Sequence, residues 1–163
     1  MIPTKIMPFF KIDYIKNDIT SGCLNCCEEN AFNIYYNGEI EKNIILGTYL
    51  SGNNDSISLS AKCLKCGSLI KVFNSCIDGY DANCEEWNTL RTINKNNVKV
   101  KLFNCSRCKG DNFSISIKYE YPDEDELKEI GFKDISNAFT WITVSLICNN
   151  CGKKYKRFID FES

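Results

Sequence analysis

Four cysteine pairs with the spacing Cys-x-x-Cys restrict what this 163-residue chain can fold into more than any other feature. The pairs are Cys23 and Cys26, Cys63 and Cys66, Cys105 and Cys108, and Cys148 and Cys151. A two-residue spacer lets both sulfurs of a pair face one ion, and two pairs supply the four thiolates of a tetrahedral site. Four thiolates leave no position for water or substrate, so such a site is expected to be structural.

The pairs form an internal repeat. The first and third lie 82 residues apart, and the second and fourth lie 85 apart. An aromatic, strand-like segment follows each first pair, and the alternating runs "ISLSAKCLKCG" and "ITVSLICNNCG" lead into each second pair. We therefore expect related copies at residues 1–73 and 96–163, separated by a segment at 74–95 that has no counterpart after the second copy.

With these pairs the chain resembles tandem zinc-ribbon proteins. The resemblance implies a mainly β fold with a short helix, built as two zinc-ribbon-like units with inserted strands or helix, and two structural Zn²⁺ ions. Pairing within each copy is favoured, because a duplicated unit should carry its own site. The predicted ligand sets are Cys23, Cys26, Cys63 and Cys66 for one ion and Cys105, Cys108, Cys148 and Cys151 for the other.

Three alternatives to these ligand sets stay open. In each copy, 36 and 39 residues separate the cysteine pairs, whereas a small ribbon has about 15–20, so ligands could cross between copies. The same cysteines could hold an iron-sulfur cluster. A thioredoxin-type redox motif fits poorly, because it needs one reactive pair in a βαβ unit.

The insertions in the two copies differ. In the first, Asn37-Gly38 predicts a two-residue hairpin turn. In the second, "YPDEDELKEIGF" predicts a short helix, because Asp123 and Glu126 have capping-box spacing and Gly131 stands where the helix should stop. The acidic residues there are interpreted as a solvated helix start rather than as a binding patch.

Three cysteines lie outside the four pairs. Cys27 follows Cys26 directly and is either an alternative ligand or a small packed residue, of which we favour the second. Cys76 and Cys84 lie in the segment between the copies. Because the chain contains no histidine, the usual Cys-His and Ser-His activation schemes are excluded, and neither cysteine is expected to be catalytic.

The composition indicates a reducing compartment. Eleven cysteines cannot all pair within the chain, and the N-terminal segment is too interrupted by proline and lysine to be a signal peptide. We expect a cytoplasmic protein that does not associate with membranes, and the abundance of Lys, Asn and Ile suggests a bacterium or phage. The formal net charge of −1 gives no overall electrostatic case for nucleic acid.

With closed metal sites, no histidine base and no phosphate-binding glycine loop, we expect a non-catalytic protein that recognises another protein, as an adaptor or as an inhibitor of the immunity type. The candidate partner-binding residues lie at or beyond the end of the first copy: Phe73, Asp78, Tyr80, Asp81 and Trp87. Alternatively, Phe73 and Trp87 fill the seam between the copies. The phrase "LIKVFNSCIDGYDAN" resembles small uncharacterised bacterial zinc-ribbon proteins, some of which sit beside toxins.

Nucleic-acid binding is the alternative function. Residues 91–109 contain six basic residues and no acid, and "KKYKRF" at 153–158 adds four basic residues beside Tyr155 and Phe158. If these segments meet on one face, they would form a basic strip with aromatic rings for stacking.

Overall fold

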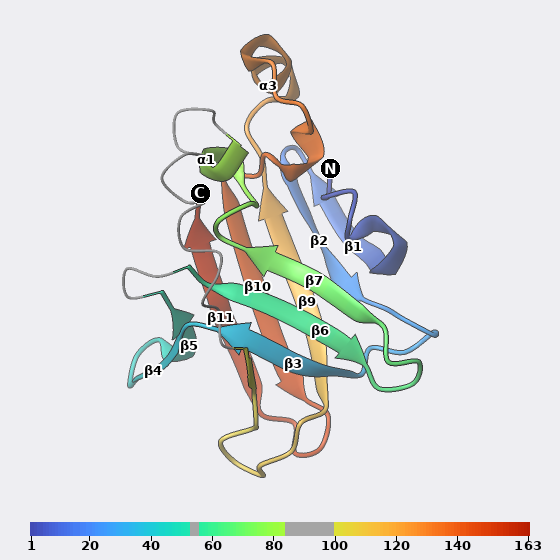
Figure 1. Cartoon of the computed structure of the whole chain (residues 1–163), viewed down its shortest axis with the longest axis vertical. Helices are drawn as coiled ribbons and strands as arrows, with labels where there is room; N and C mark the ends of the chain where they lie inside the picture. Colours follow the sequence, from blue (N-terminus) through green and yellow to red (C-terminus); the bar gives the residue numbers. More distant parts are fainter. Residues whose placement is uncertain (53–55, 84–99) are drawn as a thin grey trace.

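We describe residues 1–52, 56–83 and 100–163 of a computed structural model. Within these residues, nine strands form one curled antiparallel sheet, and β4 and β5 form a separate hairpin (Figure 1). The strands of the large sheet are β1 (Phe10–Lys16), β2 (Ile19–Leu24), β3 (Phe32–Asn37), β6 (Ser58–Cys63), β7 (Leu69–Asn74), β8 (Lys101–Leu102), β9 (Phe113–Glu120), β10 (Trp141–Cys148) and β11 (Lys154–Glu162). The hairpin strands are β4 (Glu39–Asn43) and β5 (Gly47–Ser51). The described helices are short: η1 (Met7–Phe9), α1 (Tyr80–Asn83), α3 (Glu124–Ile130) and η3 (Ile135–Asn137). The predicted mainly β fold is confirmed.

The two copies fold into matching three-stranded units. The first is β3, β6 and β7, and the second is β9, β10 and β11. Both carry a register shift at the same place, after Leu59 in β6 and after Val144 in β10. They also share a hydrogen bond from the second cysteine pair: Leu64 N–H donates to the Ala31 carbonyl, and Asn149 N–H donates to that of Asn112. The internal repeat is therefore structural as well as sequential.

The copies exchange their leading strands. β2, which contains Cys23 and leads into Cys26 of copy one, pairs with β9 of copy two, and β8, which precedes the cysteines of copy two, pairs with β3 of copy one. Phe32 and Phe113, which begin β3 and β9, are opposite each other. Equivalent residues that pair with one another mark an approximate two-fold axis.

The core lies between the two units, which cross in Figure 1. Phe73 of β7 packs against Phe161 of β11, with ring centroids 5.2 Å apart. The Phe103 ring of copy two lies 6.3 Å from the Tyr36 ring of β3 in copy one, measured between centroids. The copies thus bury their aromatic faces against each other, while the boundaries proposed at residues 73–74 and 95–96 stay a prediction.

The predicted Asn37-Gly38 hairpin is wrong. A two-residue turn would pair β3 with β4, but β4 pairs with β5, and Asn37 is the last residue of β3, opposite Ser58 of β6. Asn37 also donates through Nδ2 to the Ser56 carbonyl, at 2.9 Å. Long-range pairing of β3 therefore takes precedence over the local turn preference.

The predicted helix is confirmed as α3. Asp123 caps it by accepting a hydrogen bond from Asp125 N–H at 2.8 Å, and Gly131 ends it in the left-handed region at φ +82°. Lys128 lies 3.0 Å from Glu124, which supports the view that these acids belong to a solvated helix.

Tyr119 offers a stability test, because its hydroxyl is buried and has no hydrogen-bond partner among the described residues. Burial, with a smaller effect of the Asp78 charge, raises its pKa above the ordinary value of 10.0. Tyr119→Phe is expected to raise the free energy of unfolding by about 1 kcal/mol, because an unpaired polar atom leaves the core. Urea unfolding at neutral pH measures this.

The same substitution has a signed pH effect. Because the pKa of Tyr119 is raised on folding, its titration lowers stability further as pH rises above about 10, where the unfolded phenol ionises and the folded one does not. The advantage of Tyr119→Phe should therefore grow above that pH. A variant less stable than the wild type at neutral pH would contradict this account.

Two candidate metal centres

The second centre consists of Cys105, Cys108, Cys148 and Cys151. All four sulfurs lie within 4.8 Å of one another, with Cys105 Sγ 3.6 Å from that of Cys151 and Cys108 Sγ 3.5 Å from that of Cys148. A tetrahedral ion with bonds of about 2.3 Å to sulfur needs sulfurs about 3.8 Å apart, whereas a disulfide needs about 2.05 Å. The thiols are free, and their spacing fits four ligands of one ion.

Hydrogen bonds surround these sulfurs. Cys108 Sγ accepts from Gly110 N–H at 3.4 Å and from Asn150 Nδ2 at 3.5 Å, and Cys105 Sγ accepts from the Tyr155 hydroxyl at 3.4 Å. Burial raises the pKa of Cys105, but hydrogen bonds from Tyr155 and from backbone amides outweigh this effect and lower the pKa to about 6. Metal ligation requires thiolates, so these donors favour the ligating form.

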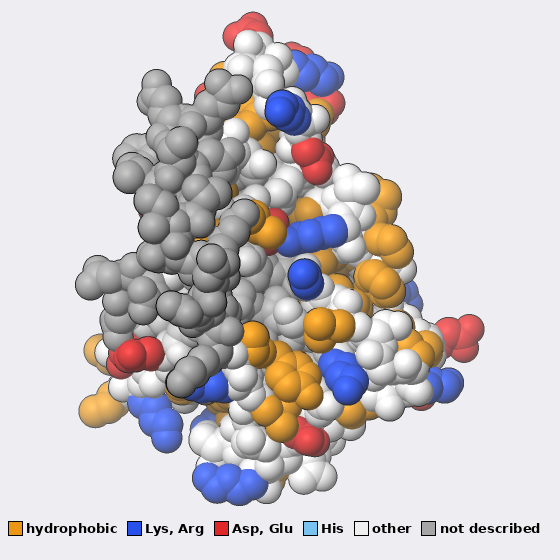
Figure 2. All heavy atoms as spheres, in the orientation of Figure 1, with side chains coloured by type: hydrophobic (Ala, Val, Ile, Leu, Met, Phe, Trp, Pro, Cys, Tyr) orange, Lys and Arg blue, Asp and Glu red, His pale blue; other side chains and the backbone are white. Residues whose placement is uncertain are grey.

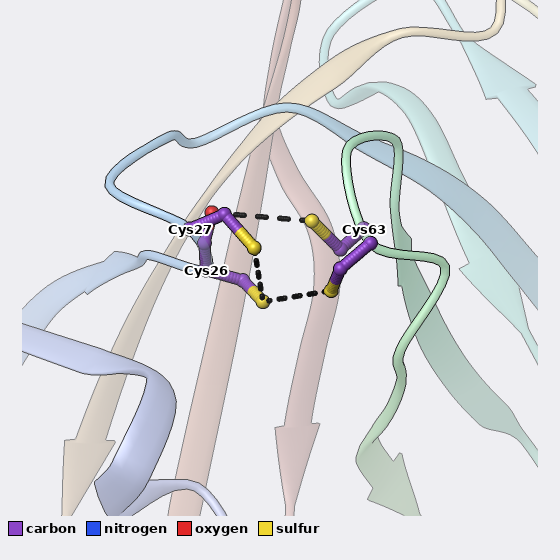
Figure 3. A group of neighbouring side chains, drawn as sticks. Cys26, Cys27 and Cys63 are labelled. Atoms are coloured by element: carbon purple, nitrogen blue, oxygen red, sulfur yellow. Dashed lines mark hydrogen bonds between the residues drawn. The ribbon is translucent and has the colours of Figure 1, made fainter.

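The first centre consists of Cys26, Cys27, Cys63 and Cys66. Figure 3 shows Cys26 and Cys27 on one side and Cys63 opposite them. Cys26 Sγ lies 3.9 Å from Cys27 Sγ and 3.6 Å from Cys66 Sγ, which again fits a tetrahedron of thiolates. A hydrogen bond with the Ser68 hydroxyl lowers the pKa of Cys66 to about 6, whereas burial raises that of Cys26 to about 12.

Cys23, a predicted ligand, does not join this group, and Cys27 takes its place. Cys23 lies within β2, opposite Lys11 of β1 and Ser116 of β9. Because β2 is paired on both sides, it continues to Leu24, and the chain turns only after Cys26. Each centre nevertheless draws all its thiols from one copy, as pairing within copies predicts.

Three of the pairs share one turn, which we call the knuckle turn. Its first cysteine donates through N–H to the carbonyl five residues later and accepts from the N–H four residues later. That fourth residue is left-handed in each case: Gly67 at φ +76°, Lys109 at +65° and Gly152 at +79°. The turn explains why glycine follows two of the pairs in the sequence.

The first pair is built differently. Cys26 and Glu29 exchange N–H to carbonyl bonds of 2.9 and 3.1 Å, and the two residues between them, Cys27 at φ +55° and Glu28 at φ +63°, are both left-handed. This is a type I′ turn without glycine. Left-handed backbone costs a residue with a side chain about 1 kcal/mol or more, so the first centre includes a strained turn.

The four candidate partner-binding residues within the described part of the chain lie around the seam between the copies. Phe73 is buried against Phe139 and Phe161, as the packing interpretation predicts. Asp78 is also buried, forms an ion pair with Lys5 and accepts from Asn74 N–H. Neither presents its side chain to solvent.

The other residues of that prediction are half-buried or lie outside the described residues. The Tyr80 ring lies 5.0 Å from that of Phe132, and Asp81 N–H donates to the Ser163 hydroxyl. Trp87 and Cys84 lie outside the described residues. Cys76 is half-buried and belongs to neither thiol group.

The two aromatic rings predicted to belong to the basic strip are not available for stacking. Tyr155 and Phe158 are buried, and the Tyr155 hydroxyl contacts Cys105 rather than solvent. Lys153 donates to the Ser106 hydroxyl at 2.7 Å and lies over the Tyr155 ring. The basic residues at 91–99 lie outside the described residues, so their position relative to Lys153 stays a prediction.

No protein-family model, curated protein or solved structure matches this chain. Among the described residues, none of the helices has the length and apolar character needed to cross a membrane.

Proposed function

We propose that each four-cysteine group binds one structural Zn²⁺ and that the protein is a non-catalytic module that recognises another protein. The observation that carries the metal assignment is the spacing of the sulfurs, all within 4.8 Å in both groups. Four thiolates complete the preferred coordination of zinc and leave no open position for a substrate.

Native mass spectrometry tests the metal assignment directly. The proposal requires two zinc ions per chain. Replacing one ligand should remove the ion of the group to which that ligand belongs and leave the other ion in place. Cys148→Ser is expected to leave one ion, whereas Cys76→Ser, outside both groups, should leave two. Iron in place of zinc, or a chain that binds neither, would contradict the proposal.

A protein partner is supported by the tip of the β4–β5 hairpin, at the left of Figure 1. Ile44 and Ile45 expose 105% and 91% of their surface, and Leu46 is exposed as well. Asn43 Oδ1 accepts hydrogen bonds from Ile45 N–H at 2.8 Å and Leu46 N–H at 3.0 Å, which gives the tip a defined shape. Adjacent exposed aliphatic side chains form a contiguous apolar patch, a feature that can mark a protein interaction site.

Quantitative affinity capture from the source cells tests this part. We expect a specific protein whose capture falls about 30-fold with Ile44→Ser/Ile45→Ser, the loss that follows from removing a hot spot of about 2 kcal/mol. Leu69→Ser, which changes an exposed residue of β7, should have no effect. A captured protein that binds both variants equally would contradict a role for the tip.

Nucleic acid is the second candidate and is less well supported, because Tyr155 and Phe158 are buried. Affinity for DNA or RNA that falls steeply with salt would favour it. Absence of binding at low salt would remove it.

A further inference from the structure

The two centres differ in ways that bear on how firmly each holds its ion. In the first centre, two successive residues other than glycine, Cys27 and Glu28, have a left-handed backbone conformation, and Cys27 is itself a ligand. In the second, the left-handed residues of the two turns are Lys109 and Gly152; neither is a ligand, and glycine adopts this backbone without strain. Strained backbone that persists in a fold is a common mark of a functional position.

The cysteines of the first centre are also more exposed to solvent than those of the second. Each centre has two buried cysteines, but the other two are exposed in the first centre, Cys27 and Cys66, and only half-buried in the second, Cys108 and Cys151. A competing ligand or a proton can therefore reach the first centre from solvent.

Hydrogen bonding to sulfur also differs. Among the described residues outside each group, Gly110, Asn150 and Tyr155 donate to sulfurs of the second centre. In the first, Ser68 alone of the described residues supplies such contacts, both to Cys66: its hydroxyl lies 3.1 Å from the sulfur, and its backbone N–H also bonds to it. Donors of this kind orient ligands and stabilise thiolate, and losing one typically costs about 10- to 100-fold in metal affinity.

We propose that the first centre is an exchangeable metal site that opens by release of Cys27, while the second holds its ion permanently. This rests on the proposed function, because both centres must bind metal. When Cys27 leaves, the turn relaxes, its thiolate takes a proton from water, and a competing ligand occupies the freed position on the ion. No oxidation or reduction is involved.

Zinc transfer to the dye 4-(2-pyridylazo)resorcinol tests the proposal on the full chain loaded with two ions. We expect two phases of one equivalent each, the fast one at least about 10-fold faster. Cys66→Ser should abolish the fast phase, and Cys151→Ser the slow one.

A variant that keeps every ligand isolates the strained turn. Glu28→Gly removes the cost of left-handed backbone at an exposed position that is not a ligand, so the fast phase should slow several-fold. Glu29→Gly, the next residue and not left-handed, is the matched control and should not slow it.

The possible results distinguish failure of the exchangeable site from failure of the proposed function, zinc binding by both centres. A chain that binds no zinc overturns the proposed function. Two bound ions released in a single phase, a slow phase assigned to the first centre, or a fast phase unchanged by Glu28→Gly overturns the exchangeable site and leaves the zinc centres intact.

Discussion

Removal of both metal ions by a strong chelator is expected to unfold the protein. Each centre joins segments distant in sequence, such as Cys26 to Cys66 and Cys108 to Cys148. Structural zinc contributes roughly 10–16 kcal/mol in finger peptides at neutral pH, which is comparable with or larger than the total stability of an ordinary domain. The metal is therefore expected to decide whether the chain is folded.

Circular dichroism together with metal analysis measures this. We expect the sheet signal to be lost as zinc leaves and to return when zinc is restored. Chelator already saturated with zinc is the control and should change nothing. Native circular dichroism after complete removal of metal would contradict a structural role for the centres.

The second large effect is expected at the approximate two-fold axis, where Phe113 is fully buried. Its ring packs against that of Phe103, and it is opposite its equivalent, Phe32. Phe113→Ala should lower the free energy of unfolding by about 3–5 kcal/mol, because it removes a large apolar surface and leaves a cavity where the copies meet.

Urea unfolding of the zinc-loaded protein measures this loss. Ile147→Ala, on the exposed face of neighbouring β10, is the control and should change stability by less than about 0.5 kcal/mol. A loss below about 1 kcal/mol at Phe113 would show that the axis is not a centre of stability.

Much of the architecture follows from the sequence. Alternation places Leu59 and Val144 inward at equivalent positions, and the repeat offset predicts two similar units. The exchange of β2 and β8 between copies does not follow, because periodicity shows which face of a strand is buried but not which strand lies beside it. For the same reason, Asn37-Gly38 suggested a local hairpin where β3 pairs with distant strands.

Most of the ligands of the two metal centres can also be predicted from the sequence. Seven of the eight predicted ligands lie in the two groups. The spacing of Cys23 from Cys26 matches that of the other pairs and therefore predicts Cys23 as a ligand, yet pairing of β2 on both sides places the turn after Cys26. The one indication in the sequence of a different ligand is Cys27, which directly follows Cys26. Phe73 shows a related limit, since composition does not distinguish an aromatic ring at a seam from one at a partner surface.

The most direct test of the two-centre account is the zinc content of Cys23→Ser and Cys27→Ser, counted by native mass spectrometry after dialysis against a mild chelator. The structure predicts two ions in Cys23→Ser, because Cys23 lies outside both groups, and one ion in Cys27→Ser, because the first centre loses its fourth thiolate. The reverse pattern, with Cys23→Ser losing an ion and Cys27→Ser keeping both, would contradict the ligand set described for the first centre.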